Sequence, residues 1–342
     1  MTRLVIHIGD CKAGSTAIQS VLRQGSYETS VERPLYAESG RRGALNHHPL
    51  SNALFMKEAS KWRDRAWSSL SEEVRNSGRT TVISSERFEF ADPLALRDVL
   101  VEFLPDVDVK LVAYIRPHLE RVVSGYVQNV KQGLFDGELD AFLGQLHKTG
   151  RFQFVPRLVQ WRKVFGDALH VRPMVRAELA GSCVATDFLS FVCEAPVEVT
   201  KIASSNPSLS APALALVRAL WRELGTNRAG NSPQVKALNS FAAALETSDP
   251  YRAEKVMMSR KQAQRAANIF VSDAVRCDSE FFGHSVLCDA NSRYLDDAPG
   301  IVQELAAPPD AVEISRIWLM ASRAKRTDGN PHATAAHWAA LR

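Results

Sequence analysis

The segment HIGDCKAGST, residues 7–16, carries residue types that bind phosphate in glycine-rich loops. Gly9 and Gly14 have the spacing G-x-x-x-x-G of a Walker A motif, in which loop amides and a helix N-terminus surround an anion. Ser15 stands where that motif requires lysine, and Lys12 lies three residues earlier. Because the Walker lysine reaches the β- and γ-phosphates, its absence disfavours ATP or GTP hydrolysis. The segment is either a loop for a different anion or a helix-capping turn with solvated side chains.

A second group of anion-binding residue types follows the apolar run VKLVAYI, residues 109–115. Arg116 comes directly after this run, and Pro117 is suited to open a helix. Ser124 lies eight residues after Arg116, which is about two helical turns. A planar guanidinium and a hydroxyl donor suit a phosphate group.

Strands and helices alternate through about residue 195. Four short apolar runs read as buried parallel strands: residues 4–8, 80–84, 109–115 and 168–174. Helical patterns separate them, beginning with STAIQSVLRQ, which stops at Gly25. The sequence predicts an α/β fold with a P-loop NTPase-like central parallel sheet over residues 1–195, flanked by helices. Residues 196–342 are predicted to form a mainly helical extension that packs on this core.

The two anion-binding segments together resemble the PAPS-dependent sulfotransferases, where PAPS is 3′-phosphoadenosine 5′-phosphosulfate. The resemblance rests on K-x-G-[ST]-T after the first strand and R-x₇-S after a later strand. The wording HIGDCKAGSTAIQ is similar to a bacterial branch associated with glycan or cell-surface sulfation. W-x-x-x-F-G (161–166) and DFLSF (187–191) resemble that branch as well. The resemblance covers roughly the first 200 residues.

The resemblance implies a sulfuryl donor site. The first loop would hold the 5′-phosphosulfate through Lys12, Ala13, Gly14, Ser15 and Thr16, and Arg116 with Ser124 would hold the 3′-phosphate. A transferring sulfuryl group carries less negative charge than a γ-phosphoryl group, so a lysine and backbone dipoles can serve where kinases need a metal ion. No metal is therefore expected.

Transfer to a hydroxyl requires a general base at the strand edge. Glu86 follows strand 80–84, where the cytosolic sulfotransferases have a histidine base; glutamate is the base in heparan sulfotransferase domains, from another segment. Glu86 could equally be a helix cap or a surface ion-pair partner. Its rivals are His47 and His48, in the predicted polar loop RRGALNHHPLSN (41–52).

Three other side chains have plainer interpretations. Arg41 and Arg42 could contact an anionic acceptor, but a solvated basic turn is favoured. His118 is expected to cap its helix locally. His7, inside the first strand, is expected to be buried and hydrogen-bonded rather than catalytic.

Composition narrows the class of protein. The chain has 342 residues, a formal charge of +4, and five cysteines without a C-x-x-C pair. The mild charge does not indicate nucleic-acid binding, and the cysteines favour a reducing compartment over a zinc site. No stretch approaches the roughly 18 apolar residues of a membrane span, and LVIHI is too short for a signal-peptide core. These features predict a cytoplasmic protein without a membrane span.

The leading hypothesis is a transferase that moves a sulfuryl group from PAPS to a hydroxyl or amine of a glycan or small-molecule acceptor. The first alternative is a P-loop small-molecule kinase that uses ATP. The second is a catalytically inactive P-loop scaffold. The sequence does not indicate the acceptor or the oligomeric state.

Overall fold

The computed structural model describes residues 2–41, 43–201, 208–225, 233–248, 254–301, 310 and 312. The chain divides into two compact units. The first comprises Met1–Pro117, Gln153–Ser205 and Val271–Ala290, and the second comprises His118–Phe152, Asn206–Phe270 and Asn291–Arg342.

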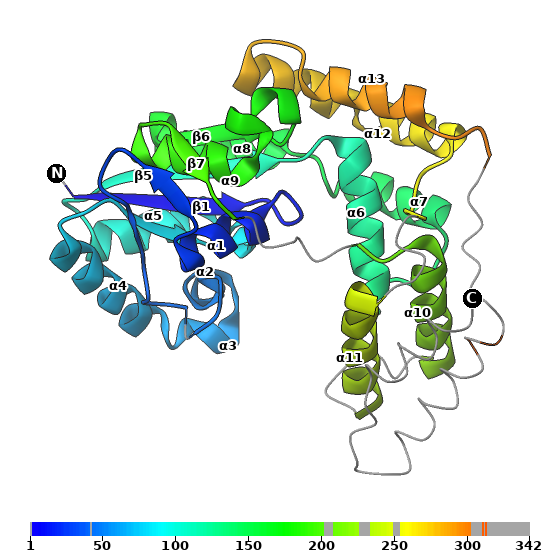
Figure 1. The fold of residues 1–342 in the computed structure, drawn as a ribbon, viewed down its shortest axis with the longest axis horizontal. Coiled ribbons are helices and arrows are strands. Elements are labelled where there is room, and N and C mark those ends of the chain that lie inside the picture. Colours follow the sequence, from blue (N-terminus) through cyan, green and yellow to red (C-terminus); the bar gives the residue numbers. More distant parts are fainter. Residues whose placement is uncertain are drawn as a thin grey trace. The chain divides into compact units, whose positions relative to one another are not determined.

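A five-stranded parallel sheet forms the centre of the first unit (Figure 1). Its strand order is β3-β4-β1-β5-β6. The strands are β1 (Arg3–Gly9), β3 (Leu35–Tyr36), β4 (Thr81–Ser84), β5 (Asp108–Ile115) and β6 (Leu169–Pro173). The four strands expected from the sequence are all present, and the short edge strand β3 was not expected.

Helices cover both faces of this sheet. Alternate residues of β1 enter two different cores, with Leu4 and Ile6 on one face and Val5 on the other. The Val5 face packs on α1 (Ser15–Gln24) and α9 (Val184–Cys193). The opposite face packs on α4 (Arg63–Ser77), α5 (Pro93–Phe103) and α8 (Val155–Phe165). Burial on both faces explains the continuous apolar runs in the sequence.

The strand order reverses direction at β1. The chain leaves β1 towards β3 on one side of the sheet, whereas it leaves β5 towards β6 on the other. The carboxyl ends of β1 and β5 therefore form a topological switch point, the usual place for a ligand in an open α/β sheet. The loop at residues 10–14 starts there, because the Asp10 N–H donates to the Tyr114 carbonyl at 2.8 Å.

Smaller elements complete the first unit. Between β3 and β4 lie α2 (His48–Phe55) and α3 (Lys57–Ser60), and η1 (Glu86–Phe90) follows β4. An antiparallel pair joins β2 (Tyr27–Thr29) to β7 (Val197–Val199). Four single turns are η2 (Gly166–Ala168), η3 (Arg176–Glu178), η4 (Ala180–Ser182) and η5 (Asp278–Phe282).

The second unit is helical in its described part. It contains α6 (His118–Lys131), α7 (Leu139–Thr149), α10 (Ala211–Leu224) and α11 (Pro233–Ser248). The division between the units falls within α12 (Arg260–Cys277) and α13 (Leu287–Asp297). The core of the second unit includes the buried rings of Tyr126, Trp221 and Phe241.

The units divide the chain differently from the expected boundary at residue 195. Residues 118–152 belong to the second unit, and residues 271–290 belong to the first. The second exchange has a clear cause: the Asp273 carboxylate accepts hydrogen bonds from the N–H groups of Phe154 (2.7 Å) and Val155 (3.1 Å), at the start of α8. A late segment of the chain thereby caps a helix of the sheet layer.

One expected loop is shorter than predicted. The sequence predicted a polar loop over 41–52, but α2 begins at His48, with Pro49 in its first turn. Proline suits this position because the first helical N–H groups have no intrahelical partner. Within the described residues, no helix is both long and apolar enough to cross a membrane.

Candidate functional site

The loop after β1 has a conformation that few residue types adopt. Gly9 and Gly14 have φ angles of 113° and 84°, and Lys12 has a φ of 65°. Lys12 is exposed at the crest of the loop. A Cβ atom at Gly14 would lie 2.7 Å from Val184 Cγ1, closer than real contacts allow. The second glycine is therefore required both by its backbone conformation and by the packing of α9.

Two backbone N–H groups of the loop already donate hydrogen bonds within the protein. The Cys11 N–H donates to the Glu89 carboxylate at 2.7 Å, and the Ala13 N–H donates to the Asp10 carbonyl at 3.2 Å. Ser15 and Thr16 lie in the first turn of α1, where N–H groups have no intrahelical partner. Thr16 is also exposed, whereas Ser15 is buried. The start of α1 is thus the part of the loop best suited to an anion.

Asp10, the first residue of the loop, forms an ion pair that the sequence did not indicate. Arg157 on α8 donates through Nη2 to Asp10 Oδ1 at 2.5 Å, and the Asp10 side chain is buried. The two residues are 147 positions apart, so no local pattern relates them.

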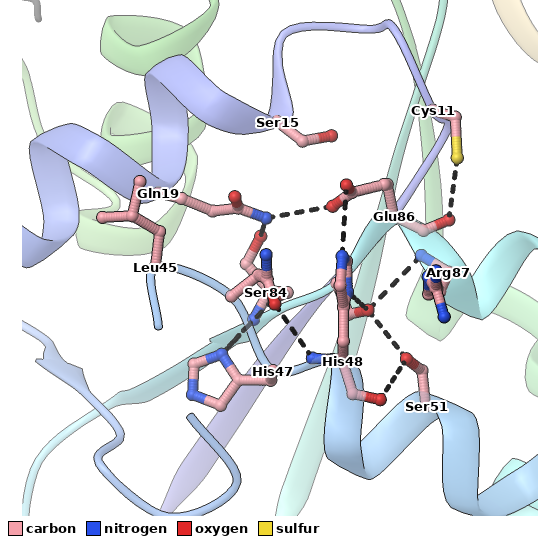
Figure 2. A network of polar contacts seen from close by, with 12 residues as sticks. Cys11, Ser15, Gln19, Leu45, His47, His48, Ser51, Ser84, Glu86 and Arg87 are labelled. Carbon is pink, nitrogen blue, oxygen red and sulfur yellow. Dashed lines mark hydrogen bonds and ion pairs between the residues drawn. The ribbon is translucent and has the colours of Figure 1, made fainter. Parts of the chain in front are cut away.

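Two rival candidates for the general base lie beside each other. His48 Nε2 and Glu86 Oε1 are 3.5 Å apart, and each side chain is 25% exposed (Figure 2). Glu86 begins η1 directly after β4, and His48 begins α2. The backbone of Glu86 is close to the loop, since its carbonyl lies 3.0 Å from where a Gly9 Cβ would be. The two side chains are partly exposed to solvent, and the backbone of Glu86 lies next to the end of β1, where the loop starts.

Two serine hydroxyls join the His48 ring in a short hydrogen-bonded chain. His48 Nδ1 lies 2.8 Å from Ser85 Oγ, and Ser85 Oγ lies 2.7 Å from Ser51 Oγ. Burial lowers the pKa of His48 below 6.5, with Glu86 opposing the shift and Arg87 adding to it. His48 is therefore neutral at pH 7. If Ser85 donates to Nδ1, Nε2 carries the proton and faces the Glu86 carboxylate.

Gln19 holds the other oxygen of Glu86. Its Nε2 atom lies 3.2 Å from Glu86 Oε2 and 3.1 Å from Ser84 Oγ, which in turn lies 2.7 Å from His7 Nδ1 (Figure 2 labels Gln19, Ser84 and Glu86). Burial lowers the pKa of His7 to about 3, so His7 is neutral. This confirms His7 as a buried, hydrogen-bonded side chain. Sequence reasoning missed Gln19; the available signal was its position three residues before Leu22, on the side of the helix that carries apolar residues.

His47 is structural. It is fully buried, its Nε2 lies 3.0 Å from the Ala37 carbonyl, and its Nδ1 accepts from the Ser84 N–H at 3.1 Å. Burial lowers its pKa to about 4. Both ring nitrogens are used in joining α2 to the strands, which leaves His48 as the histidine at the site.

Arg41 is not part of a solvated basic turn, so that expectation is wrong. Its side chain is buried, donates to the Ala37 carbonyl at 2.5 Å and pairs with Glu38. Its guanidinium also lies over the Tyr36 ring, 4.8 Å from the centroid. Arg42 lies outside the described residues.

Arg116 and Ser124 belong to different units. Arg116 follows the last residue of β5, two positions after the Tyr114 carbonyl that binds the loop. Ser124 lies on α6 of the second unit. The joint role of these residues stays a prediction. His118, expected as a local cap, is the first residue of α6; it is buried in the second unit and stacks on Phe270 with centroids 5.1 Å apart.

A buried carboxylate in DFLSF fixes α9 on the sheet. Asp187, 1% exposed, accepts from Arg172 Nε and Nη2 (both 2.6 Å) and from Tyr114 Oη (2.5 Å). It also accepts from the Ala180 N–H at 3.0 Å. Burial alone would raise the pKa of Asp187, but these hydrogen bonds outweigh it and hold the pKa below 3.8.

Asp187→Ala should lower the free energy of unfolding by about 3 kcal/mol, because it leaves a buried hydroxyl and an arginine without their partner. Urea unfolding at pH 7 measures the loss. Asp167→Ala, at an exposed carboxylate, is the control and should stay within about 0.5 kcal/mol of wild type. Since the folded pKa is depressed, the advantage of wild type over Asp187→Asn should shrink below about pH 4. An equal loss in both alanine variants would contradict the role of Asp187.

Comparison with protein-family models, with curated proteins and with solved structures finds no match to this chain. Among the residues that the structure describes, no group of three or more His, Cys, Asp or Glu side chains is arranged to hold a metal ion. The function is therefore argued from the geometry of the site.

Proposed function

We propose that this protein transfers a sulfuryl group from PAPS to a hydroxyl or amine of an acceptor, a glycan in our proposal, on a P-loop NTPase-like core. One observation carries the proposal: the loop with Lys12 at its crest starts at the switch point of the parallel sheet and lies next to the backbone of Glu86, whose side chain is beside His48. An anion site and a proton acceptor thus share one edge.

The donor end fits the residues of the loop. Lys12 would place an ammonium beside the sulfonate, and the first-turn amides at Ser15 and Thr16 would face the phosphate. The Thr16 hydroxyl adds an exposed donor. The Cys11 amide is already bound to Glu89 and the Ala13 amide to Asp10, so neither is assigned to the donor. PAPS, when bound, would supply an activated sulfuryl group with a phosphate leaving group.

The acceptor end fits a carboxylate base. Glu86 would take the proton of the acceptor hydroxyl, while Gln19 and His48 hold its two oxygens in place. A base with fixed orientation needs no rearrangement during transfer. His48 Nε2, 3.5 Å from Glu86 Oε1, would help to orient the carboxylate.

Calorimetric titration with 3′-phosphoadenosine 5′-phosphate tests the donor site, with AMP and ATP as comparisons and no metal added. Binding should require the 3′-phosphate, and Arg116→Ala should weaken it roughly tenfold or more, because a charge-assisted contact is lost. Ser124→Ala should weaken binding less, since a neutral donor is lost.

The titration also separates the alternatives. Equal affinity for AMP and the bisphosphate would contradict the roles of Arg116 and Ser124 and remove the main support for sulfuryl transfer. Magnesium-dependent ATP affinity would favour a kinase. Bisphosphate binding without transfer to any hydroxyl-bearing acceptor would favour a scaffold.

A further inference from the structure

A cavity within the first unit is lined in part by α2, the helix that begins at His48. It has a volume of about 530 Å³ and is formed by α2, α3, the first half of α4 and the turn at Gly40. Its polar and aromatic lining residues are Asn52, Trp62, Arg65 and Ser69, and Gly40, Pro49, Ala59 and Ala66 complete the wall. Its size suits a small organic group.

The wall combines an aromatic face with a positive charge. Trp62 is 44% exposed although tryptophan is usually well buried. Its ring has Lys61 Nζ at 5.5 Å from the centroid, so a cation already lies against it. Arg65 is exposed, and within the described part of the chain it has no hydrogen bond or ion pair. An indole face attracts the C–H groups of a sugar ring, and a free guanidinium binds a carboxylate or sulfate.

Helix α2 connects this cavity to the candidate base. Pro49 and Asn52 line the cavity, and His48 lies one helical turn before Asn52 on the same side of α2. Asn52 Oδ1 accepts from Arg87 Nη1 at 3.1 Å, and Arg87 is the residue after Glu86. A sugar chain seated in the cavity would therefore continue past the elements that carry Glu86 and His48.

Exposed rings extend the aromatic surface along the same elements. Phe55 ends α2 and Phe90 ends η1, and their ring centroids lie 6.0 Å apart. Both are exposed large apolar side chains. This ring pair includes a residue of α2, which also lines the cavity, and exposed aromatic surface of this kind suits an extended amphipathic ligand.

We infer that this cavity is the acceptor subsite and that it binds an acidic sugar residue, with the ring on Trp62 and the carboxylate or sulfate on Arg65. The inference rests on the proposed sulfuryl transfer for its role, while binding itself can be measured without any donor. It names the acceptor as an acidic glycan.

Trigalacturonic acid is the probe. Its methyl ester, which has the same sugar rings without the negative charges, is the control ligand. Calorimetry with the full chain should show binding of the acid that weakens with added salt and exceeds binding of the ester. Arg65→Ala should weaken binding of the acid roughly five- to tenfold. Trp62→Ala should weaken it roughly tenfold, and Trp62→Phe should restore most of the loss. Arg63→Ala, at an arginine already paired with Glu102, is the matched control and should leave affinity unchanged.

The variants are also titrated with 3′-phosphoadenosine 5′-phosphate, which separates the two proposals. Unchanged bisphosphate binding in Trp62→Ala and Arg65→Ala shows that the fold and the donor loop are intact. Absence of acid binding, equal binding of the ester, or the same affinity in Arg65→Ala and Arg63→Ala would overturn the acidic-sugar subsite. Absence of bisphosphate binding in wild type would instead overturn the proposed transfer and leave the acid titration to stand by itself.

Discussion

Glu86→Gln is expected to reduce sulfuryl transfer by about 10²- to 10⁴-fold, the usual contribution of a general base. Glutamine keeps the size of the side chain and its contact with Gln19, but it cannot accept the acceptor proton. Affinity for 3′-phosphoadenosine 5′-phosphate should be unchanged, because the proposal assigns Glu86 to the acceptor end. The loss should appear in kcat when turnover is measured with PAPS and an acidic oligosaccharide.

His48→Asn distinguishes the two members of the pair. If His48 only orients Glu86, His48→Asn should lose less turnover than Glu86→Gln. The turnover of His48→Asn should still depend on a basic group. The pKa of His48 lies below 6.5, so wild-type activity should fall as pH drops and His48 becomes a cation beside Glu86. In His48→Asn, the part of this fall in activity that comes from protonation of His48 should be absent. A nearly active Glu86→Gln with an inactive His48→Asn would make His48 the base and contradict the assignment of Glu86. Glu58→Gln, at an exposed position on α3, is the control.

Removing the ammonium of Lys12 is expected to lower transfer by about 10²- to 10³-fold, as when one donor to a developing charge is lost. Lys12→Ala is the simplest variant, but its φ of 65° would force alanine into the left-handed region. Lys12→Asn avoids this strain, because asparagine adopts that conformation more readily. Both variants should lose activity alike, and Lys12→Arg should retain part of it.

Urea unfolding supplies the control for Lys12, whose side chain is exposed. Lys12→Asn should unfold close to wild type, and Lys12→Ala slightly earlier because of its backbone. Lys163→Ala, which removes a lysine from α8, should leave both stability and turnover unchanged. Normal turnover in Lys12→Asn would mean that the loop does not hold the reacting group, and the proposed function would fail with it.

The parts of the fold set by local patterns could be predicted from the sequence. Strand β1, the loop and α1 follow one another along the chain, and the apolar run, the glycines and the helical spacing each indicate their element. The strands at Thr81–Ser84 and Asp108–Ile115 were identified for the same reason. Their parallel arrangement then required the polar residues after each strand to lie at one edge.

The pairing of side chains could not be predicted, because it depends on contacts between distant segments. Glu86 and His48 seemed to be alternatives in the sequence, yet β4 and the start of α2 bring them together. His47 and His48 are adjacent, but the helix begins between them. The His47 ring therefore lies against the Ala37 carbonyl, whereas the His48 ring lies beside Glu86. Arg41 looked like a solvated residue because nothing local indicates that Tyr36 and Ala37 bury it.

The contact between Gly14 and Val184 limits how this protein can be re-engineered. The ten residues from His7 to Thr16 cannot be transferred by themselves, because their second glycine packs against a side chain 170 positions away in the sequence. A graft of this loop onto another α/β scaffold must bring the start of α9 with it. Without that partner the turn loses the surface that holds it, and a helix with bulkier residues there would push it out of shape.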